Sequence, residues 1–533
     1  MSERRLAIYD TTLRDGTQGT GISLSSFDKM RIAERLDEFG IQFIEGGWPG
    51  SNPKDVEFFE AAATRVWKNA KIAAFGSTCR AEMDPADDAQ VQQLLAAKTP
   101  VVTIFGKSWK LHVLEVLRTS VEENCRIIAD TTAYLKGHGK EVVYDAEHFF
   151  DGFKDDPDHA LATLKAAKRG GASILVLCDT NGGSLPHEVA AITETVIREL
   201  DMPVGIHTHD DAGFGVANAL EAIRVGAVQV QGTFNGYGER VGNCNLTTVI
   251  PNLQLKMHLP VVPRLEQLVE VSHFVDEIAN CDHNERAPFV GRSAFAHKGG
   301  THVNAVQKLA RTYEHVQPEK VGNRQRILIS ELSGQTNVLM RAEELGLPLK
   351  KGSSEAKEIV RQLKELEHEG YEFEAAEASF ELLIRKVMNL HATFFTLHEY
   401  RCSFRRIHHV DGEKALETCE ATVKLEVQGV RQYTVDEGDG PVNALDGALR
   451  KALEPFYPAI RKIRLTDFKV RILDGEKGTA AKTRVLIDSF DGEQHWSTVG
   501  VSTNIIRASW LALVDSIEYY LSKQADQGAP QVK

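Results

Sequence analysis

The stretch VGIHTHDDAGFGVAN (204–218) begins with a short apolar run, VGIHTH (204–209), which is followed directly by acidic residues and then by a helix-like segment. Apolar runs of this length are typical of strands that are buried on both faces of a parallel sheet. His207 and His209 alternate along the run, so both imidazoles point to the same side of the strand. The stretch therefore predicts one β/α unit with two neighbouring histidines at the carboxyl end of its strand.

Seven other apolar runs have the same character, and helix-like segments follow them, as at Ser26–Phe39, Leu111–Leu135 and Ala212–Val225. The runs are LAIYD (6–10), IQFIEGG (41–47), KIAAFGS (71–77), VVTIFG (101–106), EVVYDAE (141–147), SILVLCDT (173–180) and VQVQGTF (228–234). Eight β/α units predict a closed (β/α)₈ TIM barrel. The alternative is an open, doubly wound sheet, which would need a Gly-rich phosphate turn after the first strand, and DTTLRDGTQ (10–18) is not one.

The remainder of the chain has a different pattern. Ile359, Leu363 and Leu366 recur at helical spacing, and a second helical stretch covers Phe380–Met388. Farther on, ATVKLEVQGVRQYTV (421–435) and GPVNALDGALRKAL (440–453) resemble TRVLIDSFDGEQHWSTV (483–499) and GVSTNIIRASWLAL (500–513), which is a weak internal repeat of strands and a helix. We therefore expect a barrel at 1–285, helical linker subdomains at 286–400, an α+β regulatory domain with an internal repeat at 401–525, and a disordered tail at 526–533.

Composition excludes several classes of protein. The formal net charge of −13 argues against a nucleic-acid surface or an anionic membrane as partner, because both need a basic field. The seven cysteines are scattered and contain no CxxC pair, which favours a reducing cytoplasmic location over a disulfide framework. The N-terminus has no apolar signal region, and no apolar run reaches the roughly 18 residues that a membrane span needs.

Polar residues gather where the predicted strands end. In a TIM barrel these carboxyl ends converge on one mouth, where active sites are built. Residues that are far apart in the sequence would then share one pocket. They are Arg14, Asp15, Glu45, Glu147, Thr180, His207 and His209.

The histidine pair allows two interpretations. His207 and His209 could converge on one ion, and imidazole with carboxylate ligands suits Mn, Zn, Co or Fe better than Mg. They could equally be two buried, hydrogen-bonded histidines. The following acids, Asp210 and Asp211, could orient the ligands or cap the next helix, and the N-cap role is favoured for Asp211.

Two other segments would contribute residues to the same barrel mouth. Arg14 and Asp15 alone would be interpreted as a rim salt bridge, but beside a metal they provide a ligand and a cation that stabilise a developing enolate or alkoxide. GYGERVGNCNL (236–246) could be a flexible loop, or it could bring the carbonyl of Asn243 to the ion.

AFAHKGGTHVNA (294–305) lies beyond the barrel and contains His297 and His302. Histidines in such a segment are usually surface residues of a loop. A histidine whose pKa lies near neutrality is also a natural general acid or base.

In chain order these segments resemble the DRE-TIM metallolyases, in particular the Claisen-condensing branch of isopropylmalate, homocitrate and citramalate synthases. The ending TVGVSTNIIRASWLAL (498–513) is similar to the allosteric regulatory domain of that family, and IEGGWPGSNPKD, AEHFFDG and ISELSGQTN are most similar to its longer citramalate synthases. The motifs are DTTLRDGTQ (10–18), IEGGWPGSNPKD (44–55), YDAEHFFDG (144–152), LCDTNGG (177–183), IHTHDDAGFGVAN (206–218), GYGERVGNCNL (236–246) and AFAHKGGTHV (294–303).

The resemblance implies a role for each matching residue. Arg14 would hold the oxo-acid oxygen, Thr180 would contact the substrate carboxylate, and Glu147 would assist at the acetyl group. His302, the candidate base, and Tyr313 would come from the appended subdomain of the same chain or of a second subunit. Thr17 departs from the common RDGEQ motif, so no acid acts there. The implied ligands of a divalent metal (Mn²⁺, Mg²⁺, Zn²⁺ or Co²⁺) are Asp15, His207, His209 and Asn243.

The resemblance also implies an activity. Acetyl-CoA and pyruvate would condense, and hydrolysis of the thioester would release citramalate and CoA as the first step of a threonine-independent route to isoleucine. Isoleucine or leucine would be the effector of the C-terminal domain of a homodimer. The alternatives are an isopropylmalate synthase acting on 2-oxoisovalerate, an acyl-CoA lyase on the same barrel, and a chain that serves mainly as a small-molecule sensor.

Overall fold

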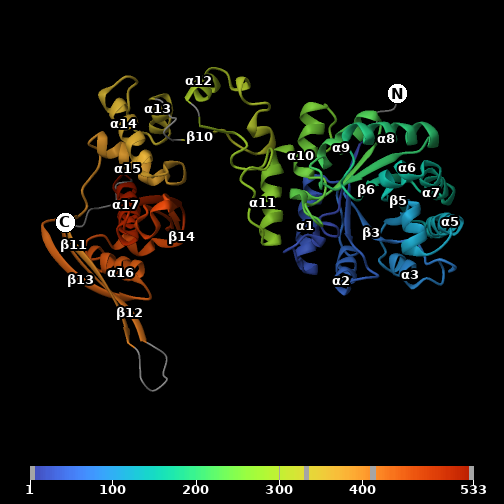
Figure 1. The fold of residues 1–533 in the computed structure, drawn as a ribbon, viewed down its shortest axis with the longest axis horizontal. Helices are drawn as coiled ribbons and strands as arrows, with labels where there is room; N and C mark the ends of the chain where they lie inside the picture. The colour runs from blue at the N-terminus through green and yellow to red at the C-terminus, as the bar shows by residue number, and fades with distance from the viewer. Residues whose placement is uncertain (1–5, 299, 329–334, 408–415, 527–533) are drawn as a thin grey trace. The chain divides into compact units, whose positions relative to one another are not determined.

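The computed structural model describes residues 6–298, 300–328, 335–407 and 416–526, so the predicted tail lies outside the described residues from 527 onward (Figure 1). The chain divides into two compact units. One comprises Met1–Phe295 with Glu314–Gln325, and the other comprises Ala296–Tyr313 with Arg326–Lys533. Within the described part of the chain, no helix has the length and apolar character that crossing a membrane requires.

The first unit is built around a closed barrel of eight parallel strands (Figure 1). β1 pairs with both β2 and β8, so the sheet has no free edge. This closure confirms the predicted TIM barrel and excludes the open, doubly wound alternative. The strands are β1 (Ala7–Asp10), β2 (Phe43–Gly47), β3 (Lys71–Ser77), β4 (Val101–Lys107), β5 (Glu141–Glu147), β6 (Ile174–Asp179), β7 (Val204–Thr208) and β8 (Gln229–Gly232).

Alternation along the strands separates two environments. The apolar side chains inside the barrel include Phe43, Val101, Val143 and Val176, which form one buried cluster. Neighbours in sequence such as Ile44, Val102 and Val142 pack outward against the helices. Two residues beyond most inner apolar positions, the inner side chain is polar or aromatic, whereas on β6 it is Cys178. These upper residues are Glu45, Thr103, Asp145, His207 and Gln231, with Phe75 and Phe105 among them.

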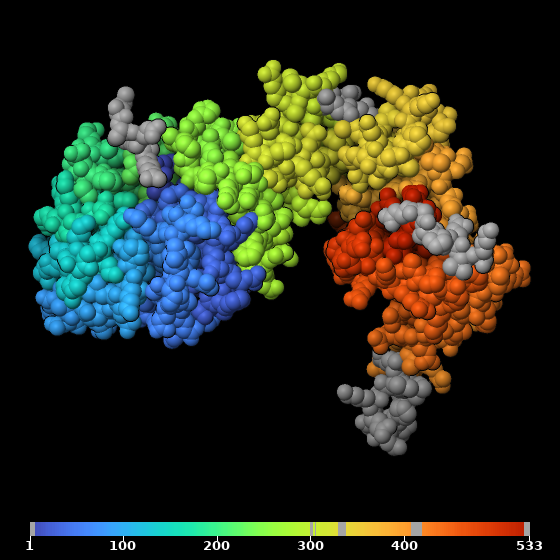
Figure 2. Space-filling model, turned by 180° about the vertical axis from the view of Figure 1, so that it is seen from behind, coloured from blue at the N-terminus to red at the C-terminus, as the bar shows by residue number. Residues whose placement is uncertain are grey.

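Helices surround the barrel, and the outer surface of residues 6–295 is coloured blue to green in Figure 2. α1 begins at the predicted residue because Ser25 and Asp28 form a reciprocal capping box. The others are α2 (Pro53–Ala62), α3 (Ala89–Ala96), α4 (Lys110–His112), α5 (Val121–Gly137), α6 (Phe149–Asp155), α7 (Pro157–Gly170), α8 (Pro186–Leu200), α9 (Gly215–Val225), α10 (Leu246–Pro251) and α11 (Leu268–Ala279), with α1 at Ser26–Phe39.

Two helix predictions were wrong in their extent. The helix expected over Leu111–Leu135 is interrupted, because Arg118 adopts a left-handed φ of 56° and Ser120 caps a new helix, α5. The helix expected from Ala212 begins only at Gly215. Asp211 is not its N-cap: the backbone N–H of Gly215 donates to Asp210 Oδ1 at 2.7 Å, and Asp211 instead pairs with Arg240 at 2.6 Å.

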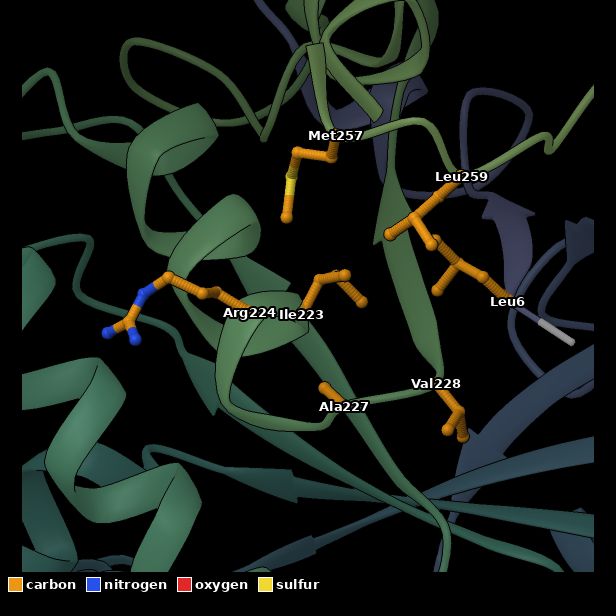
Figure 3. Close-up of a pocket in the computed structure, with 7 residues that line it drawn as sticks. All are labelled: Leu6, Ile223, Arg224, Ala227, Val228, Met257 and Leu259. Atoms are coloured by element: carbon orange, nitrogen blue, oxygen red, sulfur yellow. The ribbon is translucent and has the colours of Figure 1, made fainter. Parts of the chain in front are cut away.

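A cavity lies at the opposite, amino-terminal end of the strands (Figure 3). Its volume is about 280 Å³, and Leu6 and Val228 border it just before β1 and β8 begin. The lining is apolar except for Arg224, whose guanidinium bonds to Glu221 at 2.6 Å. The lining residues are Leu6, Ile223, Arg224, Ala227, Val228, Met257 and Leu259.

The second unit has a helical part and a mixed part. Its helical part contains α12 (Gly300–Lys308), α13 (Gln335–Glu344), α14 (Ser354–Glu369) and α15 (Glu377–Val387), and the last two confirm the helical spacing in the sequence. Three antiparallel strands and a helix then occur twice in the same order. The sequence repeat itself stays a prediction. The elements are β11 (Thr396–Ile407), β12 (Leu416–Val427), β13 (Val430–Gly438) and α16 (Pro441–Leu453), then β14 (Arg464–Ile472), β15 (Thr483–Phe490), β16 (His495–Ser502) and α17 (Ile505–Asp526).

Candidate functional site

Three of the four implied metal ligands converge at the barrel mouth. Asp15 Oδ2 lies 3.3 Å from His207 Nε2 and 4.0 Å from His209 Nε2. The two Nε2 atoms are 3.3 Å apart, and all three side chains are buried. Their ligand atoms all lie within 4.8 Å of one another, which is close enough for one ion to reach each of them.

Asn243 completes this cluster from the loop after β8. Its Nδ2 donates to Asp15 Oδ2 at 2.8 Å and lies 3.3 Å from His207 Nε2. Among the described residues its buried Oδ1 has no hydrogen-bond partner. Rotating the amide by half a turn would present that oxygen to the same point, because the two amide atoms exchange places.

A chain of hydrogen bonds orients His207. Its Nδ1 lies 2.8 Å from Gln231 Oε1, and Gln231 Nε2 donates to Asp145 Oδ1 at 3.0 Å. The glutamine oxygen can only accept, so Nδ1 carries a proton and a neutral His207 leaves the lone pair of Nε2 free toward the cluster. Burial raises the pKa of Asp145 to about 7.

Charges within the cluster are strongly perturbed. Burial opposes ionisation of Asp15, but Arg14 and then His207 hold the pKa of Asp15 well below its usual value. Burial and the neighbouring His207 lower the pKa of His209 to about 4. Near neutral pH His209 is therefore a neutral imidazole beside an ionised carboxylate. For His207, burial is outweighed by the bond to Asp15, which raises the pKa of that imidazole, so a metal ion would have to displace a proton from it.

These residues fit a divalent metal ion. Two Nε2 atoms face each other at 3.3 Å beside an ionised carboxylate, and His209 Nδ1 and Asn243 Oδ1 are buried without partners among the described residues. Facing lone pairs repel one another unless a cation or a proton lies between them. The donor set of nitrogen and oxygen atoms suits first-row divalent ions.

Arg14 is held beside the cluster by three contacts. Its Nε bonds to Glu45 Oε1 at 2.5 Å and its Nη1 lies 3.3 Å from Asp15 Oδ1. The guanidinium also lies 3.7 Å from the centre of the Phe75 ring. Tyr9 donates to the other oxygen of Glu45 at 2.7 Å, so Glu45 acts as a fixed support for the cation. The result is an oriented positive charge next to the predicted metal ligands.

Aromatic rings form the wall beyond Arg14. Phe75 stacks on Phe105 with ring centres 5.4 Å apart, and Trp48 meets both rings edge-on at 5.7 and 5.6 Å. These rings come from the carboxyl ends of β3 and β4 and from the residue after β2. Space beside the guanidinium is therefore restricted by large, flat and apolar groups.

Glu147 and Thr180 lie on neighbouring strand ends. Glu147 forms an ion pair with Lys107, its partner in the register between β4 and β5. The hydroxyl of Thr180 accepts the backbone N–H of His148 at 2.9 Å, which leaves its own proton available to donate. Among the described residues, neither side chain forms a hydrogen bond with the cluster of Asp15, His207, His209 and Asn243.

His302 and Tyr313 belong to the second unit. His302 is on α12, and its ring stacks on Tyr313 with centres 4.3 Å apart. Both side chains are exposed within that unit. His297 lies on β9 (Ala296–His297) of the same unit and is buried.

Sequence reasoning missed several supporting residues of the mouth. Gln231 and Asp145 orient His207, Tyr9 supports Glu45, and Lys107 pairs with Glu147. A signal was present for the first two, since each is a polar residue at an inward position of an otherwise apolar strand.

Comparison with known proteins agrees with this arrangement. The HMGL-like family model matches residues 5–275, and the homocitrate synthase post-HMGL domain-like model matches residues 289–371. The LeuA allosteric (dimerisation) domain matches residues 374–521. An (R)-citramalate synthase from Aquifex aeolicus is 52% identical over 98% of this chain and 99% of its own length. The chain belongs to the (R)-citramalate synthase family.

Other relatives place the chain within this family. The (R)-citramalate synthase of Geobacter sulfurreducens is 51% identical over 97% of this chain and 98% of its own length. A probable 2-isopropylmalate synthase from Methanopyrus kandleri is 32% identical over 98% of this chain and 99% of its own length. Full-length identity is therefore considerably higher to these two citramalate synthases than to that isopropylmalate synthase.

Proposed function

We propose that this enzyme condenses acetyl-CoA with pyruvate and hydrolyses the resulting thioester, which gives (R)-citramalate and CoA. The observation that carries the proposal is the identity of 52% to an (R)-citramalate synthase along nearly the whole of both chains. The barrel mouth supports it, because a fixed guanidinium lies beside a cluster of metal-ligating side chains. The first step is the formation of a bond between the acetyl methyl carbon and the oxo carbon of pyruvate.

Asp15, His207, His209 and Asn243 would hold the divalent ion, and a bound ion supplies Lewis-acid polarisation of an oxo group. Arg14 would donate to the same oxo oxygen and stabilise the negative charge that develops there as the carbon–carbon bond forms. Glu45 and Phe75 keep the guanidinium in place, so little reorganisation accompanies the reaction. The family implies a divalent metal, and Mn²⁺, Mg²⁺, Zn²⁺ and Co²⁺ are the ions to compare.

The remaining residues would bind the acid and move protons. Thr180 has a free hydroxyl proton for the pyruvate carboxylate, because its oxygen already accepts from His148. His302, with Tyr313 stacked on its ring, would take the proton of the acetyl methyl group, and Glu147 would assist. Water then attacks the thioester carbonyl, and the sulfur leaves with a proton as CoA.

The aromatic wall favours pyruvate over the larger 2-oxoisovalerate. Phe75, Phe105 and Trp48 restrict the space beside Arg14, where the side chain of the oxo acid would lie. A difference of one or two methylene groups is worth about 1–3 kcal/mol in such a pocket. We expect Phe105→Leu to improve kcat/KM for 2-oxoisovalerate relative to pyruvate by roughly 10-fold.

A panel of 2-oxo acids tests the activity. Purified protein with acetyl-CoA and each divalent ion should release free CoA thiol fastest with pyruvate, and chromatography should identify (R)-citramalate. Release of CoA with 2-oxoisovalerate but not with pyruvate would favour the isopropylmalate synthase alternative. The absence of CoA release with every acid and ion would contradict the proposal.

We also propose that the enzyme is a homodimer regulated by isoleucine and that it initiates a threonine-independent route to this amino acid. The LeuA allosteric (dimerisation) domain match supports dimerisation and an effector site. Calorimetric titration of the full chain with isoleucine, leucine and threonine would identify the effector. Light scattering would give the mass of the assembly and so test the dimer. If leucine bound and isoleucine did not, leucine would be the effector instead of isoleucine.

A further inference from the structure

The loop that carries Asn243 has an unusual backbone. Positive φ angles are costly for residues other than glycine, and such loops persist only where their surroundings hold them. Two of the positive angles belong to side-chain-bearing residues, so external anchors are required. The angles are 60° at Asn235, 74° at Gly236, 153° at Gly238, 58° at Arg240 and 110° at Gly242.

A single buried carboxylate on α11 provides the anchor. Asp276 Oδ1 accepts hydrogen bonds from Asn235 Nδ2 at 2.6 Å and from the hydroxyl of Tyr237. Asp276 Oδ2 lies 2.6 Å from His283 Nδ1, and the ring of His283 stacks on His273 with centres 3.8 Å apart. Asp276 is 5% exposed, so these bonds are shielded from water.

The same side chains have further bonds that make the anchor rigid. Ser272 on α11 donates to Asn235 Oδ1 at 2.6 Å, and its backbone carbonyl accepts from Asn235 Nδ2 at 2.8 Å. The carbonyl of Tyr237 accepts from Thr233 at 2.6 Å. Burial, and then the bond to Asp276, raise the pKa of Tyr237 well above its usual value, so the phenol stays a donor.

From this anchor the loop leads directly to the metal cluster. The backbone N–H of Asn243 donates to the carbonyl of Gly236 at 3.3 Å, next to Tyr237. A Cβ atom on Gly238 would lie 1.9 Å from Asn243 Oδ1, so the loop packs against the ligand amide. Asn243 in turn donates to Asp15 at 2.8 Å. A shift of Tyr237 therefore displaces the neighbours that hold the Asn243 side chain.

We propose that Asp276, acting through Tyr237 and Asn235, is a positioning residue that sets the affinity of the barrel mouth for its divalent ion. This inference rests on the metal site of the proposed function. The HMGL-like match ends at residue 275 and the next family match begins at residue 289, so Asp276 lies outside both. Groups that hydrogen-bond directly to a metal ligand typically change metal affinity by about 10–100-fold, and Asp276 acts through Tyr237 and Asn235, so we expect the lower end of that range.

Binding of Mn²⁺ to the full-length, metal-free protein tests the proposal. Tyr237→Phe removes only the hydroxyl that bonds to Asp276, and Asp276→Asn keeps the shape but removes the charge. Asp282→Asn is the matched control, because it neutralises an exposed acid six residues farther along the chain. Electron paramagnetic resonance gives the Kd for Mn²⁺, and circular dichroism gives the thermal midpoint of each metal-free variant.

We expect Tyr237→Phe and Asp276→Asn to weaken Mn²⁺ binding by about 10-fold or more, while Asp282→Asn keeps the wild-type Kd. Wild-type Kd values in a folded Tyr237→Phe variant would overturn the proposal and leave Asp276 a purely structural residue. If Asp276→Asn fails to fold, Tyr237→Phe alone decides. Wild-type protein that binds Mn²⁺ but makes no citramalate would contradict the proposed reaction without affecting this inference.

Discussion

The two ends of the barrel share the same eight strands and differ in almost every other respect. At the carboxyl ends, buried charged and polar groups converge, and two buried polar atoms, His209 Nδ1 and Asn243 Oδ1, lack partners among the described residues. At the amino ends, a cavity of about 280 Å³ has an apolar lining (Figure 3). An unpaired buried polar atom destabilises a protein, whereas an apolar cavity only lacks packing contacts. The comparison indicates that the mouth holds the groups for chemistry, whereas the opposite end contributes apolar packing and leaves a cavity in it.

The largest effect is expected from removing a proposed metal ligand at the mouth. His207→Ala should abolish Mn²⁺ binding and lower kcat/KM by more than about 10³-fold, because no neighbouring imidazole can replace Nε2. Steady-state assays and Mn²⁺ titration measure both. His187→Ala changes an exposed histidine on α8 and should behave like the wild type. Retained activity in His207→Ala would remove this residue from the site.

Arg14→Lys tests the oriented guanidinium rather than the metal ion. We expect kcat to fall by about 10²-fold while Mn²⁺ still binds, because an ammonium cannot maintain the bond to Glu45, the contact with Asp15 and the stacking on Phe75 together. Kinetics over a range of pyruvate concentrations separates kcat from KM. A rise of KM alone would show that Arg14 binds the acid without stabilising the transition state.

A buried acid at the end of β1, Asp10, should make the free energy of unfolding depend on pH. Burial raises the pKa of Asp10, at the end of β1, from 3.8 to about 7. Between about pH 4 and 7 the folded state then holds a proton that the unfolded state has lost, so stability decreases as the pH rises, by up to about 1.4 kcal/mol per unit. Relative to Asp10→Asn, metal-free wild type should lose stability across this range. If the difference in unfolding free energy between wild type and Asp10→Asn were the same at pH 5 and pH 8, the raised pKa of Asp10 would be contradicted.

The smallest effect is expected at the opposite end. Ala227→Val adds two methyl groups in the apolar cavity and should raise the apparent Tm by about 2 °C with unchanged kcat and KM. Ala63→Val, on an exposed position, is the control. A loss of activity in Ala227→Val would break the separation between the two ends, and a lowered Tm would show that the cavity cannot accept the added atoms.

Much of the barrel could be predicted from the sequence because buried parallel strands and their polar ends have strong local signals. The run VGIHTH (204–209) indicated both the strand and the facing histidines, and the helix expected at Ser26–Phe39 has those bounds in the structure. The break at Arg118 could not be predicted, since the apolar spacing continues through a residue whose left-handed φ depends on tertiary contacts.

The supporting contacts of the site were harder to predict from the sequence. Glu45 was identified as a mouth residue, but its bonds to Arg14 and Tyr9 depend on the register between strands that are remote in sequence. Asp211 was expected to cap the next helix because it precedes that helix, yet it pairs with Arg240 from the next loop. Phe214 is the N-cap residue, and Asp210 accepts the first backbone N–H of the helix, that of Gly215. Such exchanges of partners are decided by geometry rather than by spacing along the chain.

The bridge between His209 and Asn243 has a consequence for altering this enzyme. The backbone N–H of Asp210 donates to Gly242 at 3.0 Å and that of Cys244 to Thr208 at 2.8 Å, so the two ligand-bearing segments form one stiff strip of main chain. Replacing the loop on either side would therefore be expected to displace both His209 and Asn243. Trp48, Phe75 and Phe105 lie on another part of the rim, on or just after β2, β3 and β4, and none of them is a proposed metal ligand. Substrate range can therefore be engineered on β2–β4 while β7 and β8 are left unaltered.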